Sequence, residues 1–216
     1  MNRRDAVQYI SLLLGGTLVG SNVFLSGCKS KTGVSMVFSE ADISLLNEIA
    51  DTILPATKTP GAKAAKVGEF MTVMVNDCYE APDQKIFHEG IAKLDDASNN
   101  KNGKSFMEST PQQRHDLLVA LDKKVKDYNE KINVYVEGLT TEQRTAMALQ
   151  KDITGEDPLA DKRRQNPDYY FQMMKELTML GYFTSKIGCT EARRYFETPG
   201  KFEGDIPYKK GDKAFA

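Results

Sequence analysis

The sequence predicts an all-α protein whose single domain contains five to six helices. Apolar residues recur at helical spacing in several segments, and residues that favour helix starts stand before those segments. No stretch shows the sustained two-residue alternation of a strand. The chain has 216 residues, of which 40% are hydrophobic and 27% charged, as in a globular domain. Its net charge of −1 gives no indication of nucleic-acid binding.

The first three helices are predicted from their starts and their apolar stripes. Ser39 and Asp42 form a capping signature, and Pro55 ends the helix that follows. A second stripe runs over residues 67–79, and a third over 86–94 before the sequence NNKNGK. Cys78 lies on the second stripe, so we expect a buried and unreactive thiol.

Three further helices complete the predicted domain. Thr110, Pro111 and Gln113 mark a start, because they supply a cap, a proline at the first helical position and a capping-box partner. That helix should extend to about Gly138. We expect the last two helices over residues 141–152 and 166–188.

The N-terminal segment is typical of a signal peptide. Arg3 and Arg4 precede an uncharged run over residues 9–25, and Leu25, Ser26, Gly27 and Cys28 resemble a bacterial lipoprotein cleavage site. We therefore expect residues 1–27 to be removed and Cys28 to be lipidated. The alternative is an uncleaved anchor helix with an incidental cysteine. The arginine pair suits either the twin-arginine or the general export route.

The mature chain divides into three parts in this interpretation. Residues 28–38 form a polar tether, residues 39–189 the helical domain and residues 190–216 an extended tail. Aromatic residues and arginines concentrate near the C-terminus, and both are enriched at protein interfaces. We expect a partner to bind there, and the candidate residues are Tyr182, Phe183, Arg193, Arg194, Tyr195, Phe196, Phe202 and Tyr208. The alternative is that the tail wraps its own bundle.

The sequence contains no dinucleotide-binding fingerprint and no C-x-x-C-H haem attachment motif. His88 and His115 lack the clustered partners of a metal site. Cys78 and Cys189 could pair in an exported protein, and the sequence leaves this open. We expect no catalytic, cofactor-binding or metal-binding residue in this chain.

Two long stretches carry a resemblance to a known family. They cover residues 38–79 and 177–205, and together they resemble the gluconate 2-dehydrogenase subunit 3 family. Asp205 departs from that pattern, because members often carry a cysteine there, so a disulfide at this position is not expected. The matching motifs are Ile53-Leu54-Pro55, Thr59-Pro60-Gly61-Ala62, Asp77-Cys78-Tyr79, Gly181-Tyr182-Phe183-Thr184-Ser185 and Pro199-Gly200 with Phe202 and Gly204.

The resemblance implies a non-catalytic small subunit of an exported dehydrogenase complex. Its large partner would be a flavoprotein of the glucose-methanol-choline type that carries FAD, and a cytochrome c could accept the electrons. The chain would stabilise, anchor or escort that flavoprotein in the periplasm, held to a membrane by its lipid. The alternatives are a free-standing helical envelope lipoprotein with a ligand-binding or scaffolding role, and an enzyme in its own right.

Overall fold

The computed structural model describes residues 37–155, 157–198, 200, 204–207 and 209–215. The predicted signal peptide, Cys28 and nearly all of the tether lie outside these residues. Within them the all-α prediction is confirmed, because seven α-helices and one π-helix are present and no strand is. The order is α2 (Glu40–Ile53), α3 (Val67–Cys78), α4 (Ala81–Asn102), α5 (Pro111–Glu137), α6 (Thr141–Thr154), α7 (Ala160–Arg164), α8 (Tyr169–Thr184) and the π-helix η1 (Gly188–Ala192).

The helix starts follow the predicted capping chemistry. The Ser39 hydroxyl accepts from the Asp42 amide at 3.2 Å, and the Asp42 carboxylate accepts in return from the Ser39 amide at 2.8 Å. Thr110 and Gln113 form the same reciprocal box at the start of α5. Such boxes satisfy backbone donors that a helix start otherwise leaves free.

Two short elements were not predicted. The five residues of α7 are too few to show a periodic apolar stripe. The predicted helix over 166–188 is interrupted at Ser185, whose backbone is extended. Helical geometry resumes at Lys186 and continues into η1. The Ser185 hydroxyl accepts from the Gly188 amide at 3.0 Å, so this serine starts a new turn.

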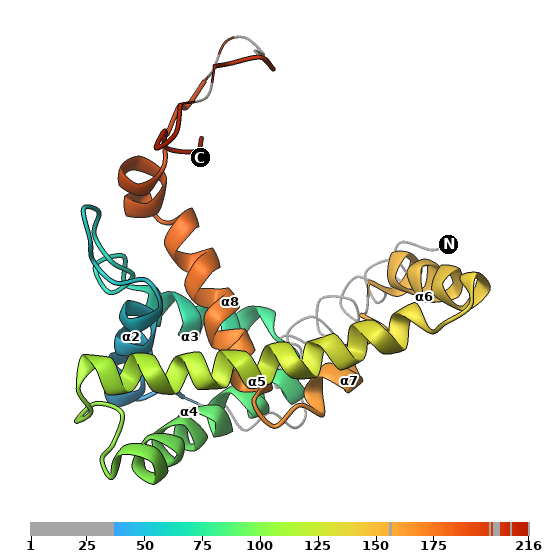
Figure 1. Cartoon of the computed structure of the whole chain (residues 1–216), viewed down its shortest axis with the longest axis horizontal. Helices are drawn as coiled ribbons and strands as arrows, with labels where there is room; N and C mark the ends of the chain where they lie inside the picture. Colours follow the sequence, from blue (N-terminus) through green and yellow to red (C-terminus); the bar gives the residue numbers. More distant parts are fainter. Residues whose placement is uncertain (1–36, 156, 199, 201–203, 208, 216) are drawn as a thin grey trace, which may run out of the picture. The chain divides into compact units, whose positions relative to one another are not determined.

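Helix α8 is the centre of the core. It packs against α2, α3, α4 and α5, and Figure 1 shows it crossing α5. Gly90 of α4 allows the closest approach, because a Cβ there would lie 2.3 Å from the Cβ of Tyr170. The largest buried side chains come from α2, α3, α4 and α8 and from Phe106 in the loop after α4, and they are Leu46, Ile49, Met71, Phe87, Leu94, Phe106, Tyr170, Phe171, Met173 and Met174.

Residues 133–165, here called the arm, comprise the end of α5, α6 and α7. None of the described residues in this range is buried. The capping box of Thr140 and Gln143 starts α6, yet its apolar residues Leu149 and Ile153 are 56% and 73% exposed. The arm is therefore helical without contributing to the core.

The expectation of a buried thiol at Cys78 is wrong, because that residue is exposed. Cys78 is the last residue of α3, and the deeply buried part of the helix ends earlier, at Val75. Periodicity placed Cys78 on the correct face of the helix but gave no information on how far the neighbouring helices reach.

Candidate functional site

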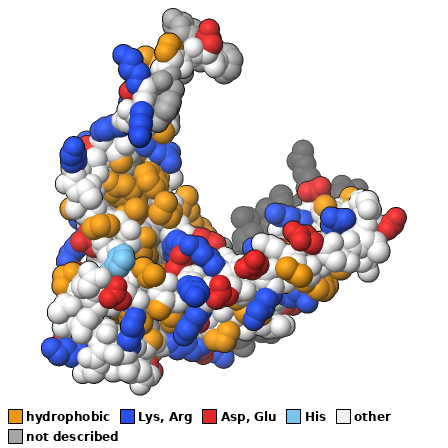
Figure 2. Space-filling model, in the orientation of Figure 1, with side chains coloured by type: hydrophobic (Ala, Val, Ile, Leu, Met, Phe, Trp, Pro, Cys, Tyr) orange, Lys and Arg blue, Asp and Glu red, His pale blue; other side chains and the backbone are white. Residues whose placement is uncertain are grey.

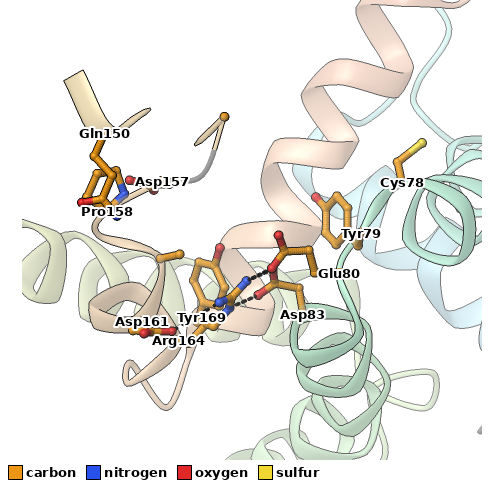
Figure 3. A pocket seen from close by; sticks show the side chains of 12 residues that line it. Cys78, Tyr79, Glu80, Asp83, Gln150, Asp157, Pro158, Asp161, Arg164 and Tyr169 are labelled. Atoms are coloured by element: carbon orange, nitrogen blue, oxygen red, sulfur yellow. Dashed lines mark hydrogen bonds and ion pairs between the residues drawn. The ribbon is translucent and has the colours of Figure 1, made fainter. Parts of the chain in front are cut away.

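A polar pocket of about 540 Å³ lies between the arm and the core (Figure 3). Its walls come from the end of α3, the start of α4, the second half of α6, the α6–α7 connection, α7 and the start of α8. The residues that line it are Cys78, Tyr79, Glu80, Asp83, Gln150, Gly155, Asp157, Pro158, Ala160, Asp161, Arg164 and Tyr169.

Arg164 organises one side of this pocket. Its guanidinium donates to both carboxylate oxygens of Asp83, at 2.8 and 2.7 Å, and to Glu80 at 2.7 Å. A longer contact of 3.3 Å reaches Asp161 within α7. The hydrogen bonds to Asp83, followed by those to Glu80, raise the pKa of Arg164 above its ordinary value. Arg164 thus joins α7 to the start of α4 (Figure 3).

The two phenols of the pocket are protonated at neutral pH. Burial, helped by the nearby Glu176 carboxylate, raises the pKa of Tyr79 to about 12. Burial also raises the pKa of Tyr169. Cys78 stands apart from the Arg164 cluster and points away from it in Figure 3. Because the arginine is engaged by carboxylates of this chain and the phenols keep their protons, the arrangement suits a structural joint.

The two histidines lie in different surroundings. The ring of His88 stacks on Phe38 with centroids 3.9 Å apart, and its buried Nε2 has no hydrogen-bond partner among the described residues. Burial lowers the pKa of His88, which favours the neutral ring. His115 is exposed beside Asp116. No group of three His, Cys, Asp or Glu residues within the described chain could hold a metal ion.

The predicted partner-binding residues fall into an inner and an outer group. Tyr182 belongs to the inner group, since it is only 4% exposed and its hydroxyl donates to the carbonyl of Pro60 at 2.7 Å. Phe183 is half-buried, packs edge-on against Tyr182 and is covered by the Arg193 guanidinium at 4.6 Å. These three side chains contact the chain itself, which favours a structural role for them.

The outer group lies on the tail. Tyr195 and Phe196 are 55% and 59% exposed, and Arg194 lies beside them. Phe202 and Tyr208 lie outside the described residues. No observation tests whether these residues bind a partner, so that assignment stays a prediction.

Arg194 makes contacts that the sequence did not reveal. Its amide donates to the carbonyl of Ala214 at 2.8 Å, and its Nε donates to the carbonyl of Lys213 at 2.9 Å. Its guanidinium covers the ring of Phe215 at 4.3 Å. The Lys213 ammonium group donates a hydrogen bond to the carbonyl of Glu191. The end of the tail therefore returns to its beginning (Figure 1).

The cysteine pairing left open by the sequence is absent here. Cys78 and Cys189 both carry free thiols in the described structure. The Cys189 thiol donates to the carbonyl of Phe183 at 3.3 Å, close to the turn at Ser185. This thiol thus contributes to the turn between α8 and η1.

Arg164 and Phe215 are the residues that sequence reasoning missed. Arg164 stands in a run of charged residues, and nothing in the sequence pairs it with acids about 80 positions away. Phe215 does add to the aromatic content of the tail, so it could have been included with the other candidates.

The fold and these contacts define a class of protein: an all-α chain with a dense core, a polar joint and an aromatic tail. In the part of the chain that the structure describes, no helix is long and apolar enough to span a bilayer. The chain belongs to the gluconate 2-dehydrogenase subunit 3 family, whose pattern matches residues 40–200. It is accordingly a small subunit of a dehydrogenase complex. No curated protein and no solved structure matches the chain.

Proposed function

We propose that this chain is a non-catalytic small subunit of an exported, FAD-dependent sugar or sugar-acid dehydrogenase of the gluconate type. Its partner is a flavoprotein of the glucose-methanol-choline type, with a cytochrome c as a possible electron acceptor. The flavin performs the hydride chemistry in the partner. This chain stabilises, anchors or escorts that partner in the periplasm.

The family match carries this proposal, because it spans residues 40–200 and so covers most of the helical domain. The pocket also supports a non-catalytic role for this chain beside a catalytic flavoprotein. Its one strongly hydrogen-bonded cation is Arg164, and carboxylates of the chain itself already occupy it. The exposed Tyr195 and Phe196 supply a surface of the kind that interfaces use.

The test is co-purification from membranes through an affinity tag on the full chain. We expect a flavoprotein in stoichiometric amount, recognised by its flavin absorbance and by its peptide masses. The isolated chain should be colourless and inactive. If no flavoprotein accompanies the chain, the free-standing envelope lipoprotein becomes the better interpretation.

The proposed anchor is the lipid on Cys28. Two or more acyl chains hold a protein on a membrane, whereas one chain binds marginally. Cys28→Ala should leave an uncleaved precursor whose mass includes residues 1–27. Normal processing of that variant would contradict lipidation, and the predicted periplasmic anchoring would lose its support.

A further inference from the structure

We propose that Phe38 and His88 form a clasp, which holds the chain immediately before α2 against α4 and opens in mild acid. Phe38 precedes Ser39, the cap of α2, and His88 lies in the first half of α4. The inference is independent of the proposed function, because the clasp is a contact within the helical domain. It applies whichever partner the chain binds.

Phe38 is seated on two rings of α4. Its ring stacks on the imidazole of His88, with centroids 3.9 Å apart and planes 21° apart. It also packs edge-on against Phe87, with centroids 6.0 Å apart. Val37, the first described residue, is 80% exposed, whereas Phe38 is only 9% exposed. Phe38 is therefore the point at which the described chain is first fastened to the core.

The imidazole of His88 suits this contact only while it is neutral. Its Nε2 atom is buried and has no hydrogen-bond partner among the described residues. A neutral ring can place an unprotonated nitrogen there, whereas the imidazolium carries N–H donors on both nitrogens. A buried donor without an acceptor costs more free energy than a cation–π contact with the Phe38 ring returns. Protonation should therefore move the His88 ring toward water and release Phe38.

The charges around His88 offset this cost only in part. Asp42 of α2 favours the protonated ring, but its carboxylate already accepts from the Ser39 amide at 2.8 Å and from the Ser39 hydroxyl at 2.7 Å. On α4 itself, Glu89 forms ion pairs of 3.8 and 3.7 Å with two lysines of the same helix. Helices α3, α5 and α8 also pack on α4, and none of their described residues brings a charge that shifts the pKa of His88.

Burial is the larger influence, so the pKa of His88 lies below its ordinary value. A lowered folded-state pKa gives stability that is fully present above the ordinary histidine pKa of about 6.5. That stability is lost as pH falls through the folded value. The clasp should accordingly be closed near neutral pH and weaken below it.

Opening of the clasp should reach the first turn of α2. Ser39 follows Phe38 directly, and its side chain forms the capping box with Asp42. The Ile43 amide donates to the Ser39 carbonyl at 3.0 Å, and the Asp42 amide donates to the Ser39 hydroxyl at 3.2 Å. Both hydrogen bonds depend on where Ser39 is held. Exchange of the Asp42 and Ile43 amides therefore reports the state of the clasp.

The experiment is amide hydrogen exchange of the full chain in detergent micelles, corrected for the intrinsic effect of pH on exchange. The two conditions lie near pH 7.5 and near pH 5.5, on either side of the ordinary histidine pKa of about 6.5. Protection of Asp42 and Ile43 should fall about three- to tenfold at the lower pH, because one proton separates the two states. Protection of α8 should stay the same.

Figure 2 shows acidic and basic side chains side by side along α5 and the arm, so acid acts on many exposed groups besides His88. Two substitutions isolate the clasp from them. His88→Phe keeps a ring for stacking but takes no proton, so protection of Asp42 and Ile43 should be equal at both pH values. Phe38→Ala removes the stacked ring, so protection of these amides should be low at both.

The matched control is His115→Phe, which removes an exposed histidine of α5 and should keep the pH response of the unmodified protein. A response that persists in His88→Phe would assign the acid sensitivity to another group and overturn the proposal. Unmodified protein with equal protection at both pH values would overturn it as well, as would normal protection in Phe38→Ala. If α8 loses protection together with α2, acid acts on the whole domain and no separate clasp exists.

Discussion

The core and the arm are both helical, yet different forces hold them. In the core, α8 buries aromatic, methionine and leucine side chains against four other helices. In the arm, no described residue between 133 and 165 is buried. Its contacts are polar: Arg164 binds Asp83, and the Tyr128 hydroxyl of α5 donates to the Lys162 carbonyl of α7 at 3.1 Å. The arm is thus helical with a capping box and polar contacts but without a buried apolar face.

This difference predicts how the two regions unfold. Burial of apolar surface is the main source of stability, so the core should unfold as one cooperative unit. The arm depends on a few hydrogen bonds at its joint and should open separately at lower free energy. Amide hydrogen exchange should accordingly be faster in α6 than in α8.

The largest effect should come from the core. Phe87→Ala removes a fully buried ring that packs edge-on against Phe38. We expect the free energy of unfolding to fall by about 3–5 kcal/mol. Denaturant titration followed by circular dichroism measures this change. A loss below about 1 kcal/mol would show that the core is far more tolerant than its burial implies.

Arg164→Ala should have the next largest effect, and it should act on the arm. The substitution leaves the half-buried Asp83 carboxylate without its partner. We expect a local loss of about 2 kcal/mol, below the cost of breaking a fully buried pair because water reaches the site. Hydrogen exchange should accelerate in α6 and α7 while α8 stays protected. Equal acceleration in α8 would contradict the separation of the two regions.

The ion pairs of Glu48 with Lys63 and Arg114 should make the free energy of unfolding depend on pH. Hydrogen bonding from Lys63, with the charge of Arg114 nearby, holds the pKa of Glu48 below 4.5. A lowered folded-state pKa contributes stability that is present above about pH 4.5 and is lost as pH falls through the folded value. Glu48→Gln should reduce stability at pH 7 by about 1–2 kcal/mol and by little at pH 3.

The measurement is denaturant unfolding of the unmodified protein and of Glu48→Gln at several pH values from 3 to 7. Asp42→Asn is a useful comparison, because it alters an acid in the same helix that belongs to a capping box. A loss that is equal at pH 3 and pH 7 would show that the Glu48 side chain matters through packing.

The smallest effect should come from the exposed face of the arm. Ile153→Ala removes a side chain that is 73% exposed, and alanine favours helix. We expect stability to change by less than about 0.5 kcal/mol. Thermal unfolding is sufficient to measure this. A larger loss would mean that Ile153 is buried in an assembly of the protein.

Much of the fold was predictable because capping and periodicity are local. Ser39, Thr110 and Gly103 stand where the helix boundaries require them. The predictions that failed depend on contacts between distant parts of the chain. Cys78 follows the apolar periodicity of its helix, but how far the neighbouring helices reach decides whether it is buried, and it is exposed. The missed turn at Ser185 carried a local signal, since serine three residues before a helical amide is a common cap.

The candidate site was less predictable than the fold. The aromatic composition of the tail indicated a contact surface, and Tyr195 and Phe196 are indeed exposed. Composition could not separate them from Tyr182, whose hydroxyl binds the carbonyl of Pro60. The same limit applies to Arg194, whose partners Lys213 and Phe215 lie about 20 residues further along the chain.

The central position of α8 has a consequence for the order of synthesis. This helix is the last long element to leave the ribosome, yet α2, α3, α4 and α5 all bury side chains against it. The hydrogen bond from Tyr182 to Pro60 spans 122 positions in sequence, a contact of high loop-closure cost. The earlier helices must therefore wait with uncovered apolar faces, and folding should be completed only after translation has passed residue 184.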